Sequence, residues 1–272
     1  MKFNPGEYSP SIGIFSMGAC LNVDEPYLPT YSGGLEVLTG DILHSCADLR
    51  IPVVGIIQSS SSGYFKQEIY ETGWQREKPA YWVPDLSLGR IDETVNIKHK
   101  GRNLIVGASP YKIIGETGFK IPVYLLDTNF QENDSEDREI TWMLYNNDPE
   151  HRIAQENVLG QGGVKLLRKL GYDIKKFHMN EGHAAFATLE LLAEGKTEEE
   201  IKNLCAFTTH TPVAAGHDKW DYNGTKNILG NFLPTDIQKF LYLPKYALLY
   251  AHNHNQVKLL LQLFELCSTR NF

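Results

Sequence analysis

The sequence predicts an α/β domain in which helices cover both faces of a parallel sheet. Short apolar runs rich in β-branched residues, such as 52–57 and 121–126, alternate with segments whose apolar residues recur every three or four positions. Parallel strands need a crossover between them, usually a helix, so this alternation is typical of a parallel sheet. With 272 residues, 42% of them hydrophobic, the chain is long enough to bury a sizeable core.

The first strand is expected at 11–16 and the first helix from about residue 35, just after two adjacent glycines, Gly33 and Gly34. Glycines let the backbone approach a ligand closely, and their N–H groups, with those of the first helical turn, form an anion site. A turn without a ligand is the structural alternative. The apolar face of the helix is expected to consist of Leu35, Leu38, Ile42, Cys46 and Leu49.

The middle of the chain predicts two buried strands separated by an irregular stretch. The strands lie at 52–57 and 121–126, and the polar run 58–63 after the first is expected to be a flexible loop. Weak strand patterns with many turn residues predict an antiparallel insertion over 71–119, at one end of the sheet.

The second half predicts further helices and strands in alternation. A helix near 150–170 is expected to end at Gly171, and the segments that follow are a strand at 175–179, helices at 181–194 and 197–203, and a strand at 204–209. The helix at 197–203 opens with a capping-box pattern. The last strand delivers His210 at its carboxyl end, and a less regular helical pattern begins at Asp221.

Composition limits the classes of binding partner and the cellular location that are expected for the protein. The formal net charge is −7, with acidic and basic residues interspersed, which argues against nucleic acid or an anionic membrane as a partner. The N-terminal stretch lacks the apolar run of a signal peptide and no apolar run reaches membrane-spanning length, so a cytoplasmic location is expected. Cys20, Cys46, Cys205 and Cys267 lie far apart without metal-ligand spacing, so reduced thiols and no metal are expected.

Three polar clusters fall at the expected carboxyl ends of strands or directly after them. They are Ser32-Gly33-Gly34, Asn180-Glu181-Gly182-His183 and Thr209-His210-Thr211-Pro212. In an open parallel α/β sheet, ligands bind at this edge. A strand-terminal histidine alone is more often structural, but three clusters converging on one edge predict a ligand site.

Several runs resemble, in matching order from about residue 12 to 233, the N-terminal half of a compact prokaryotic α-glucan (glycogen, starch or maltodextrin) phosphorylase. The runs are Tyr31–Leu35 with Gly40-Asp41, Gly63–Gln67, Glu136–Thr141, Phe177–His183, and Phe207–Val213 with Gly216-His217-Asp218. The resemblance implies that residues 1–272 form the first Rossmann-like domain of a GT-B fold.

The same resemblance implies an activity. Family members cut α-1,4-glucans with inorganic phosphate and release glucose 1-phosphate. Their cofactor, pyridoxal phosphate, is held on a lysine of the C-terminal domain, and no lysine here lies in a run resembling that motif. The expectation is therefore a glycosyltransferase of carbohydrate metabolism whose C-terminal domain is absent from this chain, inactive alone and dependent on a complementary chain.

By the resemblance, the site residues fall into two groups. His210 matches the histidine that contacts the glucosyl unit, and Asp148 lies in the acidic loop at the cleft mouth, so these two are the expected catalytic residues. The expected substrate- and phosphate-binding residues are Gly33, Gly34, Leu35, Asn180, Glu181 and His183.

The sequence also departs from the family pattern. Glu36 stands where relatives usually carry glycine, Gly18 where they usually carry glutamate, and 58–62 replaces a stretch that commonly includes a basic residue. A carboxylate at Glu36 beside the expected anion site weakens phosphate binding. The apolar residues of the tail, 242–272, suggest a missing partner or a homo-oligomer contact.

Two other functions are weighed against the phosphorylase. A non-catalytic glucan-binding or interaction remnant of the family is favoured by Glu36 and the missing half, whereas the retained His210 favours the enzyme lineage. A dinucleotide-binding oxidoreductase is disfavoured because no G-x-G-x-x-G follows the first strand.

Overall fold

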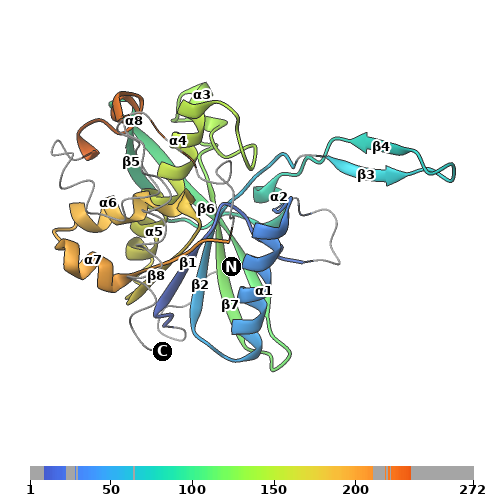
Figure 1. The fold of residues 1–272 in the computed structure, drawn as a ribbon, viewed down its shortest axis with the longest axis horizontal. Helices are drawn as coiled ribbons and strands as arrows, with labels where there is room; N and C mark the ends of the chain where they lie inside the picture. Colours follow the sequence, from blue (N-terminus) through green and yellow to red (C-terminus); the bar gives the residue numbers. More distant parts are fainter. Residues whose placement is uncertain are drawn as a thin grey trace.

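The structure is a computed structural model that describes residues 9–22, 28, 30–63, 65–210, 218, 220 and 222–233. Within these residues, seven strands form one sheet in the order β5-β6-β7-β2-β1-β8-β9 (Figure 1). The strands are β1 (Ile12–Phe15), β2 (Val53–Gln58), β5 (Val95–His99), β6 (Arg102–Ile114), β7 (Lys120–Asp127), β8 (Lys176–Asn180) and β9 (Cys205–Thr208). Strands β7, β2, β1, β8 and β9 are parallel, and β5 and β6 extend the sheet antiparallel at one edge.

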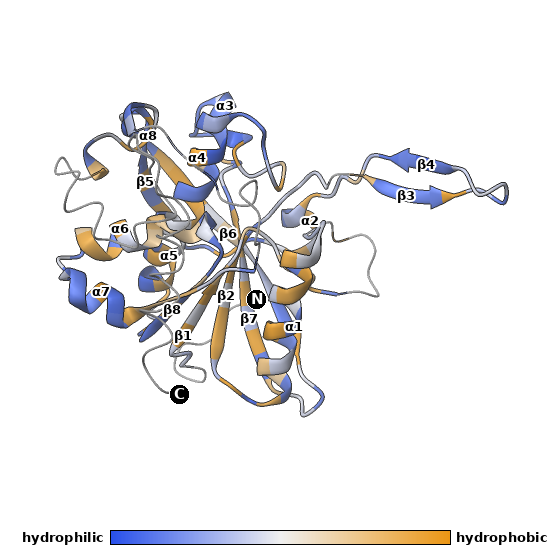
Figure 2. Ribbon diagram, in the orientation of Figure 1, coloured by the Kyte–Doolittle hydropathy of each residue, from blue (hydrophilic) through white to orange (hydrophobic). Residues whose placement is uncertain are grey.

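Helices pack on both faces of the sheet, which confirms the predicted α/β class. Because side chains alternate along a strand, Ile14 enters one core with Leu43 of α1 (Gly34–Asp48), and Phe15 enters the other. Figure 2 shows the central strands as the most hydrophobic part of the fold. The elements that supply the second core from outside the sheet include α4 (Pro149–Asn157), η1 (Val158–Gly162), α5 (Gly163–Lys169), α6 (Phe186–Ala193), α7 (Glu198–Leu204) and α8 (Tyr222–Leu229).

The predicted buried face of α1 is wrong by a rotation of the helix. The residues of α1 that are buried are Glu36, Thr39, Gly40, Leu43 and Ala47. Leu49 is 70% exposed, and Leu35, Leu38, Ile42 and Cys46 are partly buried. Gly40 explains the rotation, since a Cβ there would lie 2.2 Å from the backbone oxygen of Cys20. The helix turns its smallest residue toward the chain that follows β1.

The polar run 58–63 is not the solvated loop that the sequence predicts. Gln58 is the last residue of β2, and Gln58, Ser59 and Ser60 are fully buried. Ser62 forms bridges with Tyr81 and Met143. Gln58, Ser59 and Ser60 are buried because they form or continue the end of a central strand of the sheet, where neighbouring elements cover them on both faces.

The antiparallel insertion predicted over 71–119 divides into two parts. Only β3 (Lys66–Ile69) and β4 (Gln75–Lys78) form a separate antiparallel hairpin, which extends away from the sheet in Figure 1. Strands β5 and β6 belong to the main sheet, because β6 pairs with β7 over eight residue pairs from Gly107–Asp127 to Ile114–Lys120. The short helix α2 (Pro84–Leu88) connects the two parts.

The predictions for the second half are largely confirmed. The helix expected at 150–170 runs through α4, η1 and α5, with a π-helical segment at η1, where a Cβ on Gly160 would lie 2.4 Å from the Ala187 nitrogen. Gly171 follows the last turn with a φ of 81°. The capping box of α7 is present, between Thr197 and Glu200.

Some predictions lie outside the described residues. These are the tail 242–272, Cys267, and the motif positions Tyr64 and 211–217. In the part of the chain that the structure describes, no helix combines the length and the apolar character needed to cross a bilayer. The acidic segment 135–138 forms the short helix α3 (Ser135–Arg138).

His99, at the end of β5, provides a test of the fold through its pH dependence. Its side chain is 4% exposed, and its Nε2 lies 3.3 Å from Asp137 Oδ1. Burial lowers the pKa of His99 to about 4, an effect that Asp137 opposes and the cations of Lys100 and Arg102 reinforce. The unfolded chain takes up this proton near pH 6.5, so it binds more protons than the folded chain between pH 6.5 and 4.

We therefore expect the free energy of unfolding to fall by up to about 3 kcal/mol through this group as the pH falls from 7 to 4. In His99→Gln, which does not titrate, this part of the pH dependence is lost. Urea unfolding of both proteins at pH 7, 5.5 and 4.5 measures the difference. Parallel pH profiles for the two proteins would contradict the assignment.

Candidate functional site

The order in which the chain adds strands to the sheet reverses between β1 and β8. From β1 the chain builds outward through β2 and β7 on one side, and later returns to place β8 and β9 on the other. In open parallel sheets, the carboxyl ends of strands at such a switch point form the ligand crevice. Ser16 follows β1, and Asn180 ends β8, so these two residues flank the point where a ligand is expected.

Asn180 joins four elements at this point. Its side chain is 1% exposed, and its Nδ2 donates to Thr39 Oγ1 of α1 at 2.8 Å and to Ser16 Oγ at 3.2 Å. Its Oδ1 therefore faces the other way, where it lies 3.0 Å from His210 Nε2. The amide thus connects the end of β1, the first turns of α1, the end of β8 and the residue pair after β9.

The partner of His210 determines how its ring can act. An amide oxygen only accepts, so Nε2 donates the hydrogen bond to Asn180 Oδ1. In the neutral ring, Nδ1 then carries the lone pair and accepts from a ligand hydroxyl. His210 is exposed, in contrast to Asn180, and it can therefore meet a ligand at this edge of the sheet.

Glu181 holds the turn that carries His210. It is fully buried, and its Oε1 accepts from the His210 backbone nitrogen at 2.5 Å while Oε2 accepts from Thr209 Oγ1 at 2.9 Å. Its φ of 60° is rare outside glycine and costs about 1–3 kcal/mol. Such strain accumulates at functional sites. Glu181 thus holds the backbone of His210 from a buried position.

The two predicted glycines lie at the start of α1. Gly33 caps the helix in an extended conformation, Gly34 is its first residue, and both are exposed. A Cβ on Gly34 would meet nothing within 4 Å, so packing does not require a glycine there. Leu35 is partly buried, and Glu36, next in the chain, is 1% exposed.

His183 belongs to a buried cluster beside this edge. It lies in η2 (Gly182–Ala184) with its ring 5.6 Å from that of Tyr145, and its Nε2 is 3.7 Å from Asp218 Oδ2. The guanidinium of Arg152 lies 4.4 Å from the centre of the Tyr145 ring and binds Asp218 at 2.9 Å. The Tyr145 hydroxyl in turn donates to Glu36 Oε1.

The pKa values of the two carboxyl groups next to Arg152 are shifted in opposite directions. Burial raises the pKa of Glu156 well above its usual range, although Arg152 opposes this at 3.4 Å. Burial also acts on Asp218, but Arg152 holds the pKa of this carboxyl below its usual range. Trp220 Nε1 donates to Glu156 at 3.0 Å. The positive charge of Arg152 is therefore balanced mainly by Asp218.

Asp148 has a structural task that the sequence did not predict. It is exposed and caps α4, where its Oδ1 accepts from the His151 nitrogen at 2.8 Å. None of the contacts found in the described part of the chain joins it to Asn180, Glu181 or His210. The structure thus brings the last three together and leaves Asp148 at a helix start.

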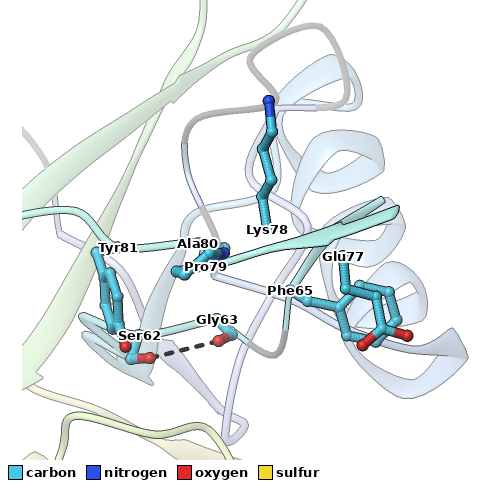
Figure 3. A pocket seen from close by; sticks show the side chains of 8 residues that line it. All are labelled: Ser62, Gly63, Phe65, Glu77, Lys78, Pro79, Ala80 and Tyr81. Atoms are coloured by element: carbon cyan, nitrogen blue, oxygen red, sulfur yellow. Dashed lines mark hydrogen bonds between the residues drawn. The ribbon is translucent and has the colours of Figure 1, made fainter. Parts of the chain in front are cut away.

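A pocket of about 260 Å³ lies elsewhere, at the root of the β3–β4 hairpin. Figure 3 shows Phe65 beside Glu77 on one side and Tyr81 with Ser62 on the other. Its lining is Ser62, Gly63, Phe65, Glu77, Lys78, Pro79, Ala80 and Tyr81, which includes none of the predicted site residues.

Sequence reasoning missed several contributors to the site. Ser16 and Thr39 bind the Asn180 amide, and Tyr145 and Arg152 support His183. Ser16 could have been found, since it is a polar residue directly after a strand. Thr39 lies on the buried face of α1, which became apparent only from the packing of Gly40 in the structure. The sequence pattern around Tyr145 and Arg152 contains no feature that predicts a site.

No family model matches the chain. It is 39% identical over 221 residues to the maltodextrin phosphorylase of Thermococcus litoralis, a match that covers 76% of this chain and 26% of that protein. It is 36% identical over 213 residues to the glycogen phosphorylase of Mycobacterium tuberculosis (71% and 24%) and 36% identical over 205 residues to that of Aquifex aeolicus (71% and 29%). The chain spans about a quarter of the length of the curated relatives it matches. Over about three quarters of its own length, it is a homologue of the maltodextrin and glycogen phosphorylases.

Proposed function

We propose that this chain supplies the sugar-binding wall of an α-glucan phosphorylase, which splits α-1,4-glucan with inorganic phosphate and releases glucose 1-phosphate. The observation that carries the proposal is the 3.0 Å bond between Asn180 Oδ1 and His210 Nε2 at the switch point of the sheet. It presents an exposed imidazole, fixed in one orientation, where ligands of such sheets bind.

The groups at this edge suit sugar hydroxyls. A hydroxyl both donates and accepts, so it can donate to His210 Nδ1 while accepting from another group. Asn180 holds the ring orientation, and Glu181 holds the backbone of His210 through a 2.5 Å bond. We assign His210 to contact with the glucosyl unit, and Asn180, Glu181 and His183 to positioning. Asp148 is proposed at the cleft mouth on the resemblance alone.

The cofactor implied by the family, pyridoxal phosphate, does not fit the residues at the start of α1. The resemblance puts its phosphate group, or that of the substrate, near Gly33 and Gly34. There the Glu36 carboxylate already lies close to the backbone, since Oε2 is 3.5 Å from the Cβ position of Gly33. We therefore assign this chain a role toward glucan, and propose that the cofactor lysine belongs to a second domain.

Binding of maltoheptaose tests the site. We expect the 272-residue chain to bind this glucan in a calorimetric titration, and His210→Ala to weaken the affinity at least about tenfold, because a hydrogen bond to the sugar is lost. His44→Ala, on α1 with its ring bound to the Leu21 carbonyl at 3.0 Å, is the matched control and should bind normally. Equal affinities of the wild type and His210→Ala would remove His210 from the site.

Release of glucose 1-phosphate tests the proposed division of the activity between this chain and a second domain. The purified chain should release no glucose 1-phosphate from maltoheptaose, and adding the C-terminal domain of a related phosphorylase should restore release. His210→Ala should then abolish most of it. Release by the chain alone would refute the proposed division. Glucan binding without any restored turnover would instead support a non-catalytic glucan-binding remnant of the family.

Substitutions of two glycines in α1, Gly34 and Gly40, test ligand contact and packing separately. In Gly34→Ala the new methyl group meets nothing within 4 Å, so we expect stability to be unchanged or raised by up to about 1 kcal/mol, but glucan binding to weaken. In Gly40→Ala the methyl group would lie 2.2 Å from the Cys20 oxygen, so we expect a loss of about 1–3 kcal/mol. Urea unfolding and calorimetry measure both. Normal glucan binding by Gly34→Ala would place the sugar away from this backbone.

A further inference from the structure

The start of α1 carries an anion of its own. Glu36 lies in the first turn of the helix, and its side chain is 1% exposed. A carboxylate at this position compensates the positive end of the helix dipole. Its Oε2 lies 3.5 Å from the Cβ position of Gly33, the residue that caps the helix. The charge therefore lies against the helix end.

Tyr145 holds the carboxylate in this place. Its hydroxyl donates to Glu36 Oε1. The Tyr145 ring is itself packed, with the Arg152 guanidinium 4.4 Å and the His183 ring 5.6 Å from its centre. Because the donor is fixed on two sides, the carboxylate cannot swing away without losing a hydrogen bond in a largely buried setting.

Gly18 leaves the room that Glu36 needs. A Cβ at position 18 would lie 3.0 Å from Glu36 Cγ and 2.4 Å from the Thr30 oxygen. Real Cβ atoms do not approach a backbone oxygen so closely, so a side chain at position 18 would displace this arrangement. The absence of a side chain at position 18 is thus a condition for the buried carboxylate at the helix start.

The cation nearby does not neutralise an additional anion. Arg152 binds Asp218 Oδ2 at 2.9 Å, and this carboxylate already balances most of its charge. Ser32, Gly33 and Gly34 are exposed, so a solute can reach the helix start. A phosphate group that arrives there, with about 1.5–2 negative charges, meets Glu36.

We propose that Glu36 is the resident anion of α1 and excludes phosphate from the helix start, so that this wall selects uncharged sugar hydroxyls over anions. The sugar part rests on the proposed function, whereas the exclusion of phosphate rests on the contacts of Glu36. Two unit charges about 4 Å apart repel enough, even in water, to weaken binding about fivefold. Glu36 is then a specificity-determining residue.

The test is a titration of the full chain with inorganic phosphate at pH 7 and constant ionic strength. The amide NMR signals of Gly33, Gly34 and Leu35 report binding. We expect Glu36→Gln, which keeps the shape and an acceptor for Tyr145, to raise the phosphate affinity at these amides at least about fivefold. Asp41→Asn is the matched control. It removes one exposed charge from the same helix, about 10 Å along the axis from the helix start at Gly34, and should change the affinity less than twofold.

Thermal unfolding checks that each variant folds, and Glu36→Gly provides a second carboxylate-free protein with the same expected gain. Equal phosphate affinity of the wild type and the carboxylate-free variants would overturn the proposal, and so would an equal gain in Asp41→Asn. Maltoheptaose is titrated in the same samples. If the wild type does not bind it while Glu36→Gln gains phosphate affinity, the proposed function fails and the exclusion of phosphate stands.

Discussion

The candidate site at the carboxyl ends of β1, β8 and β9 depends on one buried amide, that of Asn180. Its two N–H groups and its oxygen are used by Thr39, Ser16 and His210, which come from three different parts of the chain. Losing any partner would leave a polar atom buried without a hydrogen bond, at a cost of about 1–3 kcal/mol. Because the amide lies at the point where the strand order reverses, the orientation of His210 depends on the backbone positions of β1, β8 and α1 as well as on the turn that Glu181 holds.

The charged groups beside this edge are arranged so that they balance one another. Arg152 is 6% exposed, and such a charge is tolerated only when it is paired and hydrogen-bonded. Asp218 provides the main pairing, while burial raises the pKa of Glu156 and thereby favours its uncharged form. The exposed groups at the strand ends are the His210 ring and the backbone at the start of α1, which lies beside the Glu36 carboxylate.

The sequence predicted the fold class and the strand that ends before His210 because these depend on local patterns. Alternation of apolar runs identifies strands and helices, and a polar residue after a strand lies at the ligand edge wherever the sheet places it. Burial could not be predicted in the same way. Ser59 and Ser60 look like a solvated loop, but they continue a central strand, and their burial depends on elements distant in the chain. The face of α1 likewise depends on the contact between Gly40 and Cys20, which no periodicity contains.

Gly18 and Glu36 show how a contact changes the interpretation of a sequence. By the resemblance alone, each residue taken separately is expected to depart from the phosphorylase pattern, with glutamate expected at position 18 and glycine at position 36. In the structure they meet, because Glu36 Cγ lies 3.0 Å from the position that a Cβ on residue 18 would take. Gly18 and Glu36 therefore belong to one packing arrangement, in which the lack of a side chain after β1 leaves room for the side chain at the start of α1. Its consequence is electrostatic, since the carboxylate now lies at the positive end of a helix, where an anionic ligand would otherwise be most stable.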